Sequence, residues 1–185
     1  NLKDYEAFFK QKSNLDLIII PDTLAECIHF FGNENPKDIA NKSLRVNLSY
    51  MAAMGAKPIF YNLSISVPKY KVKNFIPKFA KGLFEDQELY GLKLIGGDLT
   101  SSLQNINITI TIFGETLNKK SISRDGAKVG DMLYVSGVLG LSKIGLDNFV
   151  SKSKSFIAAQ KRYFFPQPRV DRGLSLNKTA NRMME

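Results

Sequence analysis

Three segments of the chain carry the hydrophobic patterns that predict β-strands. Residues 15–20 form a nearly continuous apolar run bounded by Pro21, whereas residues 59–67 and 106–113 alternate between apolar and polar positions. Because successive side chains of a strand point to opposite faces of a sheet, each alternating segment is expected to bury one face. The continuous run is typical of a strand that is covered on both faces.

Two longer segments show the spacing of three and four residues that predicts amphipathic helices. The first follows Asn35, an N-cap candidate, and Pro36, which suits the first helical position. It is expected to extend for about 20 residues. The second covers residues 70–90, with Asn74 as a possible cap that would place Pro77 in the first turn, where proline is tolerated.

This alternation of strands and helices indicates a layered α/β (α+β) fold. We expect residues 1–117 to form a mixed β-sheet with helices on one face, and residues 118–185 to hold a connector and the start of an incomplete second α+β domain. In that second part, residues 132–135 predict a short strand and residues 156–164 a helix. The segment from residue 174 onward is expected to end inside an element.

Two carboxylates stand where predicted strands end. Asp22 follows the first apolar run, and Asp98 follows a shorter apolar run, residues 92–95, and the pair Gly96 and Gly97. Glycine lets a backbone approach a ligand closely, and Mg²⁺ is usually held by one or two carboxylates together with substrate phosphates. Gly-Gly-Asp alone is more often a plain turn, and the single histidine, His29, has apolar neighbours typical of a packing residue. These residues therefore indicate a site only in combination.

The composition narrows the class of protein and its partners. No apolar run is long enough to cross a bilayer, and residues 1–13 are too polar for a signal peptide, so they are interpreted as a helix end or a frayed arm. The single cysteine, Cys27, suits a reducing compartment, which favours the cytoplasm. We therefore expect no membrane as partner, and no nucleic acid either, because the basic residues are scattered singly.

The positive charge is concentrated in the second half of the chain. The net charge is +9, of which residues 1–115 contribute +1, from 13 Lys/Arg and 12 Asp/Glu. Residues 116–185 contribute +8, from 13 Lys/Arg and 5 Asp/Glu. Such an excess favours a phosphate-rich ligand or a segment that lacks its usual acidic partners.

From residue 15 onward, the motifs of the chain follow the order found in one known family. Residues 22–30 read Asp-Thr-Leu-Ala-Glu-Cys-Ile-His-Phe, residues 46–58 read Val-Asn-Leu-Ser-Tyr-Met-Ala-Ala-Met-Gly-Ala-Lys-Pro, and Gly96-Gly97-Asp98 follows. Residues 124–131, Arg-Asp-Gly-Ala-Lys-Val-Gly-Asp, and residues 163–170 complete the set. The sequence resembles the thiamine-monophosphate kinase family, within a superfamily that also includes aminoimidazole ribonucleotide synthetase.

The resemblance implies a transferase that moves the γ-phosphate of ATP onto thiamine monophosphate in thiamine biosynthesis. It implies that Asp22 and Asp98 act as catalytic residues that hold Mg²⁺, that Gly97, Asp98 and Arg124 bind ATP, and that His29 contacts the thiamine phosphate. It also implies a homodimer. The alternating segment 106–113, with an edge that needs cover, is consistent with pairing between two copies through their sheets.

Departures from the family pattern leave the activity open. Tyr50 stands where the family has an aspartate, and a phenol with a reference pKa near 10 is a poor Mg²⁺ ligand at neutral pH. The acidic segment that precedes residue 15 in the family is absent, and Glu185 stands at the first aspartate of the next motif. Pro21 and Ser101 are smaller changes. The alternatives are a non-catalytic remnant or dimerisation module of the same fold, or a superfamily member with a different phosphate acceptor.

Overall fold

A computed structural model describes residues 7–10, 15–116, 121–152 and 155–185 of the 185-residue chain. The predicted boundary at residues 117 and 118 lies outside the described residues. A twisted five-stranded sheet forms the centre of the described part, with strand order β1-β2-β5-β3-β4. The strands are β1 (Ala7–Lys10), β2 (Asp16–Ala25), β3 (Ala56–Pro68), β4 (Lys93–Ser102) and β5 (Asn107–Thr116).

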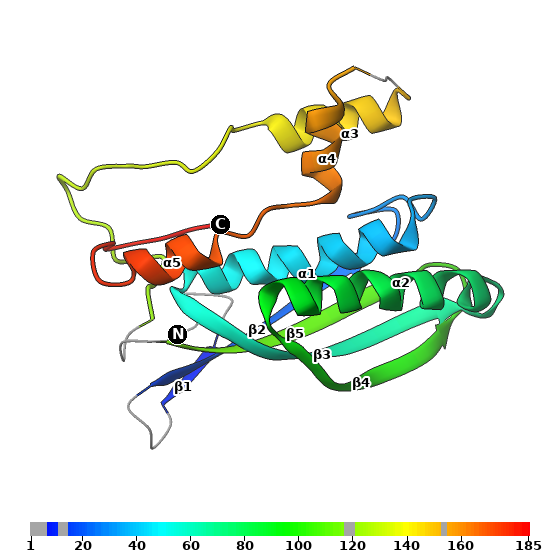
Figure 1. The fold of residues 1–185 in the computed structure, drawn as a ribbon, viewed down its shortest axis with the longest axis horizontal. Coiled ribbons are helices and arrows are strands. Elements are labelled where there is room, and N and C mark those ends of the chain that lie inside the picture. Colours follow the sequence, from blue (N-terminus) through cyan, green and yellow to red (C-terminus); the bar gives the residue numbers. More distant parts are fainter. Residues whose placement is uncertain (1–6, 11–14, 117–120, 153–154) are drawn as a thin grey trace.

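The sheet is mixed, and its helices lie on one face. β3 and β4 pair in parallel, and the other neighbours are antiparallel. The parallel pair requires a long crossover, which α2 (Lys69–Tyr90) supplies. α1 (Pro36–Ala53) and α2 pack side by side on the same face of the sheet (Figure 1). This arrangement confirms the predicted α/β class with helices on one face.

The helix-covered face of the sheet contains the hydrophobic core. Alternate residues of β2 and β5 point into it, as the period of two predicts, and the apolar stripes of α1 and α2 close it. The fully or almost fully buried members include Ile18, Ile20, Leu44, Leu48, Met51, Tyr61, Phe79, Ile106, Ile108, Ile110 and Ile112. The opposite face of the same strands is left open in a single chain.

The strand ends predicted from proline and glycine were wrong. β2 does not stop at Pro21 but continues to Ala25, and β1 pairs only as far as Ile19, so one edge of β2 is free where proline lacks its N–H. β4 likewise runs through Gly96, Gly97 and Asp98 instead of ending there. β5 has no free edge, because β2 and β3 pair with its two sides, so the expectation of an uncovered edge on this segment was wrong.

The helix boundaries confirm one cap and correct another. Asn35 caps α1 as predicted, with its side chain accepting the N–H of Lys37 at 3.1 Å. α2 begins at Lys69 without a side-chain cap, so Asn74 is no cap and Pro77 lies inside the helix.

Two predictions for the amino-terminal part were wrong. β2 is not covered on both faces, since Leu17 and Ile19 are only partly buried. The described part of the amino end, β1, is a strand and not a helix end.

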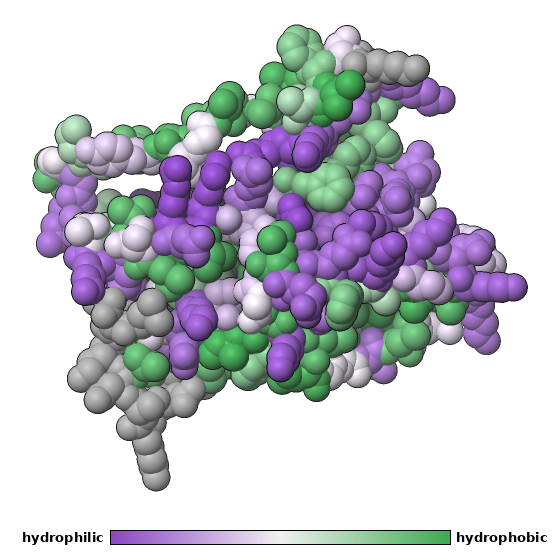
Figure 2. Space-filling model, viewed as in Figure 1, coloured by the Kyte–Doolittle hydropathy of each residue, from purple (hydrophilic) through white to green (hydrophobic). Residues whose placement is uncertain are grey.

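The second half contributes three helices and an extended connector. The predicted helix near residue 157 is confirmed as α4 (Ile157–Phe164), which packs against α3 (Leu141–Val150), a helix that the pattern did not predict. α5 (Val170–Leu176) packs on α1 and ends well before the last residue. Residues 132–135 form no strand; they are exposed and irregular, in a connector that Figure 2 shows partly coloured as hydrophobic.

Close helix contacts hold this second half to the core. A Cβ atom on Gly173 of α5 would lie 2.1 Å from the carbonyl oxygen of Ala52 in α1, so only glycine permits the approach. Asn177 donates to the carbonyl of Gly55 at 3.2 Å. Within the described part of the chain, every helix is too short or too polar to cross a bilayer.

Candidate active site

The two predicted metal ligands lie on different strands and on different faces of the sheet. Asp22 of β2 is paired with Ile110, in the row of residues that point toward the helices. Asp98 of β4 is paired with Ser64, which belongs to the open face. β5 and β3 lie between them, and strand spacings of about 4.8 Å separate their Cα atoms by roughly 14 Å.

Asp98 stands at the end of a polar row on the open face. Thr23, Thr109 and Ser64 are successive partners across β2, β5 and β3, and Ser64 pairs with Asp98. Thr23 and Thr109 are hydrogen-bonded to each other through their hydroxyls at 2.8 Å. An exposed carboxylate beside hydroxyl groups can coordinate a hydrated cation and orient the phosphates of a nucleotide.

Gly97 has a structural reason to lack a side chain. A Cβ atom there would lie 1.9 Å from the carbonyl oxygen of Leu63, so β4 can follow β3 only with glycine at this position. The pairing register shifts just before it, between Tyr61 and Asn62, which indicates a bulge. Strand pairing alone therefore requires glycine at position 97, whether or not Gly97 also contacts ATP.

His29 presents one nitrogen to solvent and uses the other to hold its own loop. Its Nδ1 accepts the backbone N–H of Ala25 at 3.0 Å, so in the neutral ring the proton is on Nε2. The side chain is exposed. Nε2 can therefore donate to an oxygen of a bound phosphate, which is the contact expected for this residue.

Lys42 of α1 anchors the same loop and was not predicted from the sequence. Its ammonium donates to the carbonyl oxygen of His29 at 2.7 Å and lies 3.8 Å from the centre of the Tyr163 ring in α4. Burial lowers the pKa of Lys42 to about 8, with the carboxylate of Glu34 partly opposing the shift. No sequence motif marks this role, because the contact joins residues of three separate elements.

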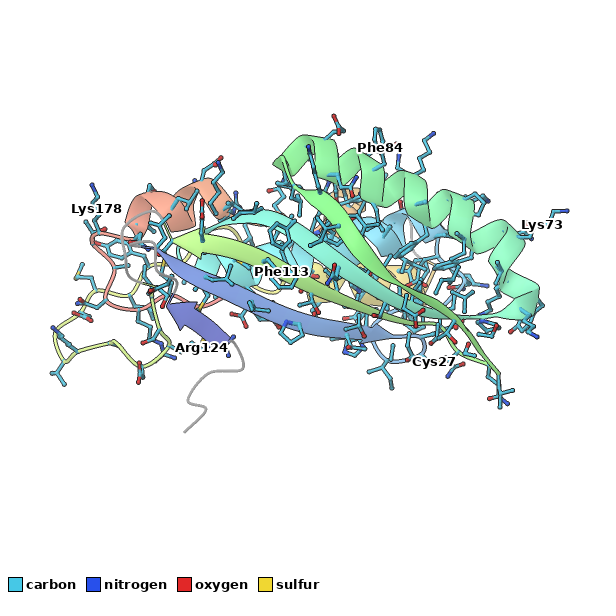
Figure 3. The ribbon with its side chains drawn as sticks, turned by 90° about the horizontal axis from the view of Figure 1, so that it is seen from below. Cys27, Lys73, Phe84, Phe113, Arg124 and Lys178 are labelled. Atoms are coloured by element: carbon cyan, nitrogen blue, oxygen red, sulfur yellow. The ribbon has the colours of Figure 1, made fainter. Side chains whose placement is uncertain are left out.

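Arg124 lies far from the His29 loop and has a carboxylate partner. Its Nη2 donates to both carboxylate oxygens of Glu185, at 2.7 and 2.9 Å. Figure 3 shows Arg124 and Cys27, two residues before His29, well apart along the long axis, on either side of its middle. A single copy therefore does not bring Arg124 and His29 to the same ligand.

The residues present do not fit one shared Mg²⁺ ion within a single copy. The described residues include no group of three or more His, Cys, Asp or Glu side chains that could hold a metal together. Asp22 and Asp98 could each hold a separate ion, because a single carboxylate with substrate phosphates and water satisfies Mg²⁺. Tyr50, at the position where an aspartate was expected, is partly buried against the hydrophobic core.

The family of the chain follows from its match to a family model over the sheet and its two long helices. Residues 3–116 match the family described as "AIR synthase related protein, N-terminal domain". The match covers more than half of the chain, which therefore belongs to the AIR synthase related family.

Several relatives of this chain share one name. The chain is 40% identical over 183 residues to the thiamine-monophosphate kinase of Buchnera aphidicola subsp. Schizaphis graminum, covering 96% of this chain and 56% of the relative. The Haemophilus influenzae thiamine-monophosphate kinase is 36% identical over 88% of this chain and 50% of its own length. A solved structure described as "AaThiL complexed with AMPPCP and TMP" superposes with a TM-score of 0.90 at 28% identity, over 97% of this chain and 58% of that one. The chain thus spans about half the length of these proteins.

Proposed function

We propose that this chain acts in ATP-dependent phosphorylation of thiamine monophosphate to thiamine diphosphate, as part or all of a thiamine-monophosphate kinase. The observation that carries the proposal is 40% identity to a kinase of that name over 96% of the chain, with the motifs around Asp22, His29, Asp98 and Arg124 in place. The structural likeness to a protein complexed with AMPPCP and TMP supports ATP as co-substrate. A cytoplasmic location belongs to the proposal, because it suits the single free cysteine.

In this proposal, the chain's own residues position two anionic substrates. Asp98 on the open face and the adjacent backbone of Gly97 form the nucleotide side. Arg124 contacts nucleotide phosphates, and Nε2 of His29 donates to the phosphate of the acceptor. Asp98 and Asp22 would hold Mg²⁺, which supplies charge neutralisation when phosphates approach each other. The boundary near residue 117 between a nucleotide-binding domain and a second domain is part of the same proposal.

The proposal includes a homodimer, because residues that lie far apart in one copy can meet across a two-fold axis. β4 forms one edge of the sheet, and all its residues but Ser102 are exposed. Leu94, Ile95 and Leu99 on this strand are 44%, 57% and 53% exposed, and a long apolar edge is a pairing surface. Sedimentation as a monomer at working concentration would contradict this part.

The direct test is coupled ADP release with ATP, Mg²⁺ and thiamine monophosphate. We expect turnover that requires the acceptor and is lost in Asp98→Asn. Absence of turnover even at high Mg²⁺ would reject kinase activity for this chain. Shared sites have a sharper test: a mixture of His29→Ala and Arg124→Gln chains should regain activity, because a mixed dimer contains one site with both native residues. No recovery after subunit exchange would place each site within one copy.

A second candidate, a non-catalytic module of the same fold, is favoured by the separation of Asp22 from Asp98 and by Tyr50 at the family's aspartate position. Isothermal titration of ATP with and without Mg²⁺ distinguishes the two. The kinase proposal expects Mg²⁺-dependent ATP binding, and the module expects none. Restoring the family carboxylate in Tyr50→Asp should raise Mg²⁺ affinity only if the rest of the site is intact.

A further inference from the structure

A basic cavity lies between α1, α4 and the start of α3, and its lining includes none of the residues assigned to the kinase site. Its volume is about 540 Å³, and its lining contains Arg45, Lys161 and Arg162 together with Leu141 and Gln167. The lining includes no carboxylate. A concave surface that is lined by cations and lacks an acid favours a small anion.

The guanidinium group of Arg162, which lines this cavity, and that of Arg169 approach one point beside Gly137. The position of a Cβ atom on Gly137 would lie 3.2 Å from Nη2 of Arg162 and 3.4 Å from Nη2 of Arg169. Both arginines are half-buried, and neither forms an ion pair with another residue in the part of the chain that the structure describes. Two like charges that reach the same point repel each other unless an anion lies between them.

The backbone beside these arginines is open to an anion for two reasons. Gly137 has φ +94°, a conformation that side chains rarely adopt, and its missing side chain leaves free the point that both guanidinium groups reach. Gly140, three residues later, is the N-cap residue of the ten-residue helix α3. Because glycine has no side chain, it offers no side-chain acceptor to the N–H groups of the first turn. Arginine pairs match the oxygens of a phosphate through two-point hydrogen bonds.

We infer that Arg162, Arg169 and the backbone at Gly137 form a binding site for phosphate or a phosphate monoester. Arg45 adds positive charge to the cavity but is itself paired with Asp86. The site is independent of the proposed kinase activity, since it uses none of the residues assigned to it. It also explains part of the excess charge of +8 over residues 116–185.

Binding of inorganic phosphate to the full chain, measured by isothermal titration, tests the inference. We expect saturable binding that weakens at least tenfold in Arg162→Gln and in Arg169→Gln. The matched control is Lys73→Gln, which removes one charge from the exposed side of α2 (Figure 3) and should leave binding unchanged. Equal weakening in all three variants would mean that only net charge matters, which overturns the inference.

A pair of glycine variants tests the geometry without changing the charge. Gly137→Ala would place a methyl group within 3.4 Å of both guanidinium groups and should abolish phosphate binding. Gly130→Ala changes a glycine of the same connector that also has a positive φ, +97°, but whose Cβ would meet nothing within 4 Å. Binding should survive in this control, and circular dichroism checks that both variants fold. Loss in both, or in neither, would contradict the assigned position.

Glycine-selective ¹⁵N labelling gives a readout at the site and separates the sources of the phosphate. Addition of inorganic phosphate should shift the amide signals of Gly137 and Gly140 and leave that of Gly91 unchanged. Glycerol 2-phosphate should shift the same signals at lower concentration if the cavity accommodates the ester group, and at equal or higher concentration if free phosphate is the ligand. Shifts confined to other glycines would reject the site.

Discussion

Arg124 and Glu185 form a two-point ion pair although 61 residues separate them in the chain. Because both side chains are about one quarter exposed, such a pair is worth roughly 1 kcal/mol. A nucleotide phosphate that uses Arg124 has to replace the carboxylate of Glu185. We therefore predict that Glu185→Gln raises ATP affinity about fivefold, as measured by titration calorimetry. Arg124→Gln is the control and should weaken ATP binding; unchanged affinity in both variants would remove Arg124 from the nucleotide site.

The separation of Asp22 from Asp98 predicts how their substitutions combine. If each carboxylate holds its own Mg²⁺, Asp22→Asn and Asp98→Asn should each weaken Mg²⁺-dependent ATP binding. Their effects should add in the double variant, within about 0.5 kcal/mol, because distant sites act independently. Calorimetric titrations of the four proteins measure this, with exposed Glu88→Gln as the control. A double variant no weaker than either single one would indicate one shared ion.

Cys27 adopts a backbone conformation that suits glycine. Its φ is +70°, in the left-handed region, where a non-glycine residue costs roughly 1–2 kcal/mol. Glycine loses more chain entropy on folding, by about 0.5–1 kcal/mol. Cys27→Gly is therefore predicted to raise the free energy of unfolding by about 0.5–1 kcal/mol in urea titrations. A β-branched change, Cys27→Val, should lower it, and the reverse order would show that the turn is not strained.

Lys42 predicts a pH dependence of stability. Its pKa in the folded protein is lowered by burial to about 8, below the value of 10.5 without these surroundings. The unfolded chain thus binds more protons between these two pH values, so the free energy of unfolding contributed by this residue should rise with pH across that window. Urea titrations of the native protein and of Lys42→Met should show a steeper rise in the native protein. Equal slopes would contradict the prediction.

A buried ion pair between the two long helices predicts a large loss of stability. Arg45 of α1 donates from Nε and Nη2 to both carboxylate oxygens of Asp86 of α2, at 2.8 and 2.7 Å, and Asp86 is 1% exposed. Asp86→Ala leaves the arginine without its partner, so we expect a loss of about 3 kcal/mol in urea titrations. Lys37→Met breaks the exposed pair with Glu85 on the same two helices and should cost less than about 1 kcal/mol. Similar losses in the two variants would argue against this difference.

The sequence predicts those elements whose stability comes from their own hydrophobic pattern. The alternation in residues 106–113 and the Asn35 cap locate β5 and the start of α1, although β5 continues three residues further, to Thr116. Glycine and proline in a sequence are taken to end a strand. In this chain, however, β4 continues through Gly96 and Gly97, because β3 pairs closely with it there. α3 was missed because Gly140 and Gly145 flank and interrupt a ten-residue apolar segment, whereas Gly145 serves close packing against Ala159.

The candidate site is less predictable than the fold, because its geometry depends on pairing across strands. Residue types at Asp22, His29 and Asp98 indicate phosphate and metal chemistry, but nothing local states that Asp22 faces the helices and Asp98 the open side. That difference follows from the register with β5 and β3. The expected strand at residues 132–135 failed for a related reason: no strand in the described part of the chain pairs with it.

The place of Asp98 within a hydrogen-bonded strand, and not on a loop, has a consequence for ligand capture. Its backbone is fixed by the neighbouring β3 before any ligand arrives, so binding requires little further loss of chain entropy at this point. Binding of a ligand at Asp98 should therefore not wait for a rearrangement of β4, and its association rate should approach the limit set by diffusion.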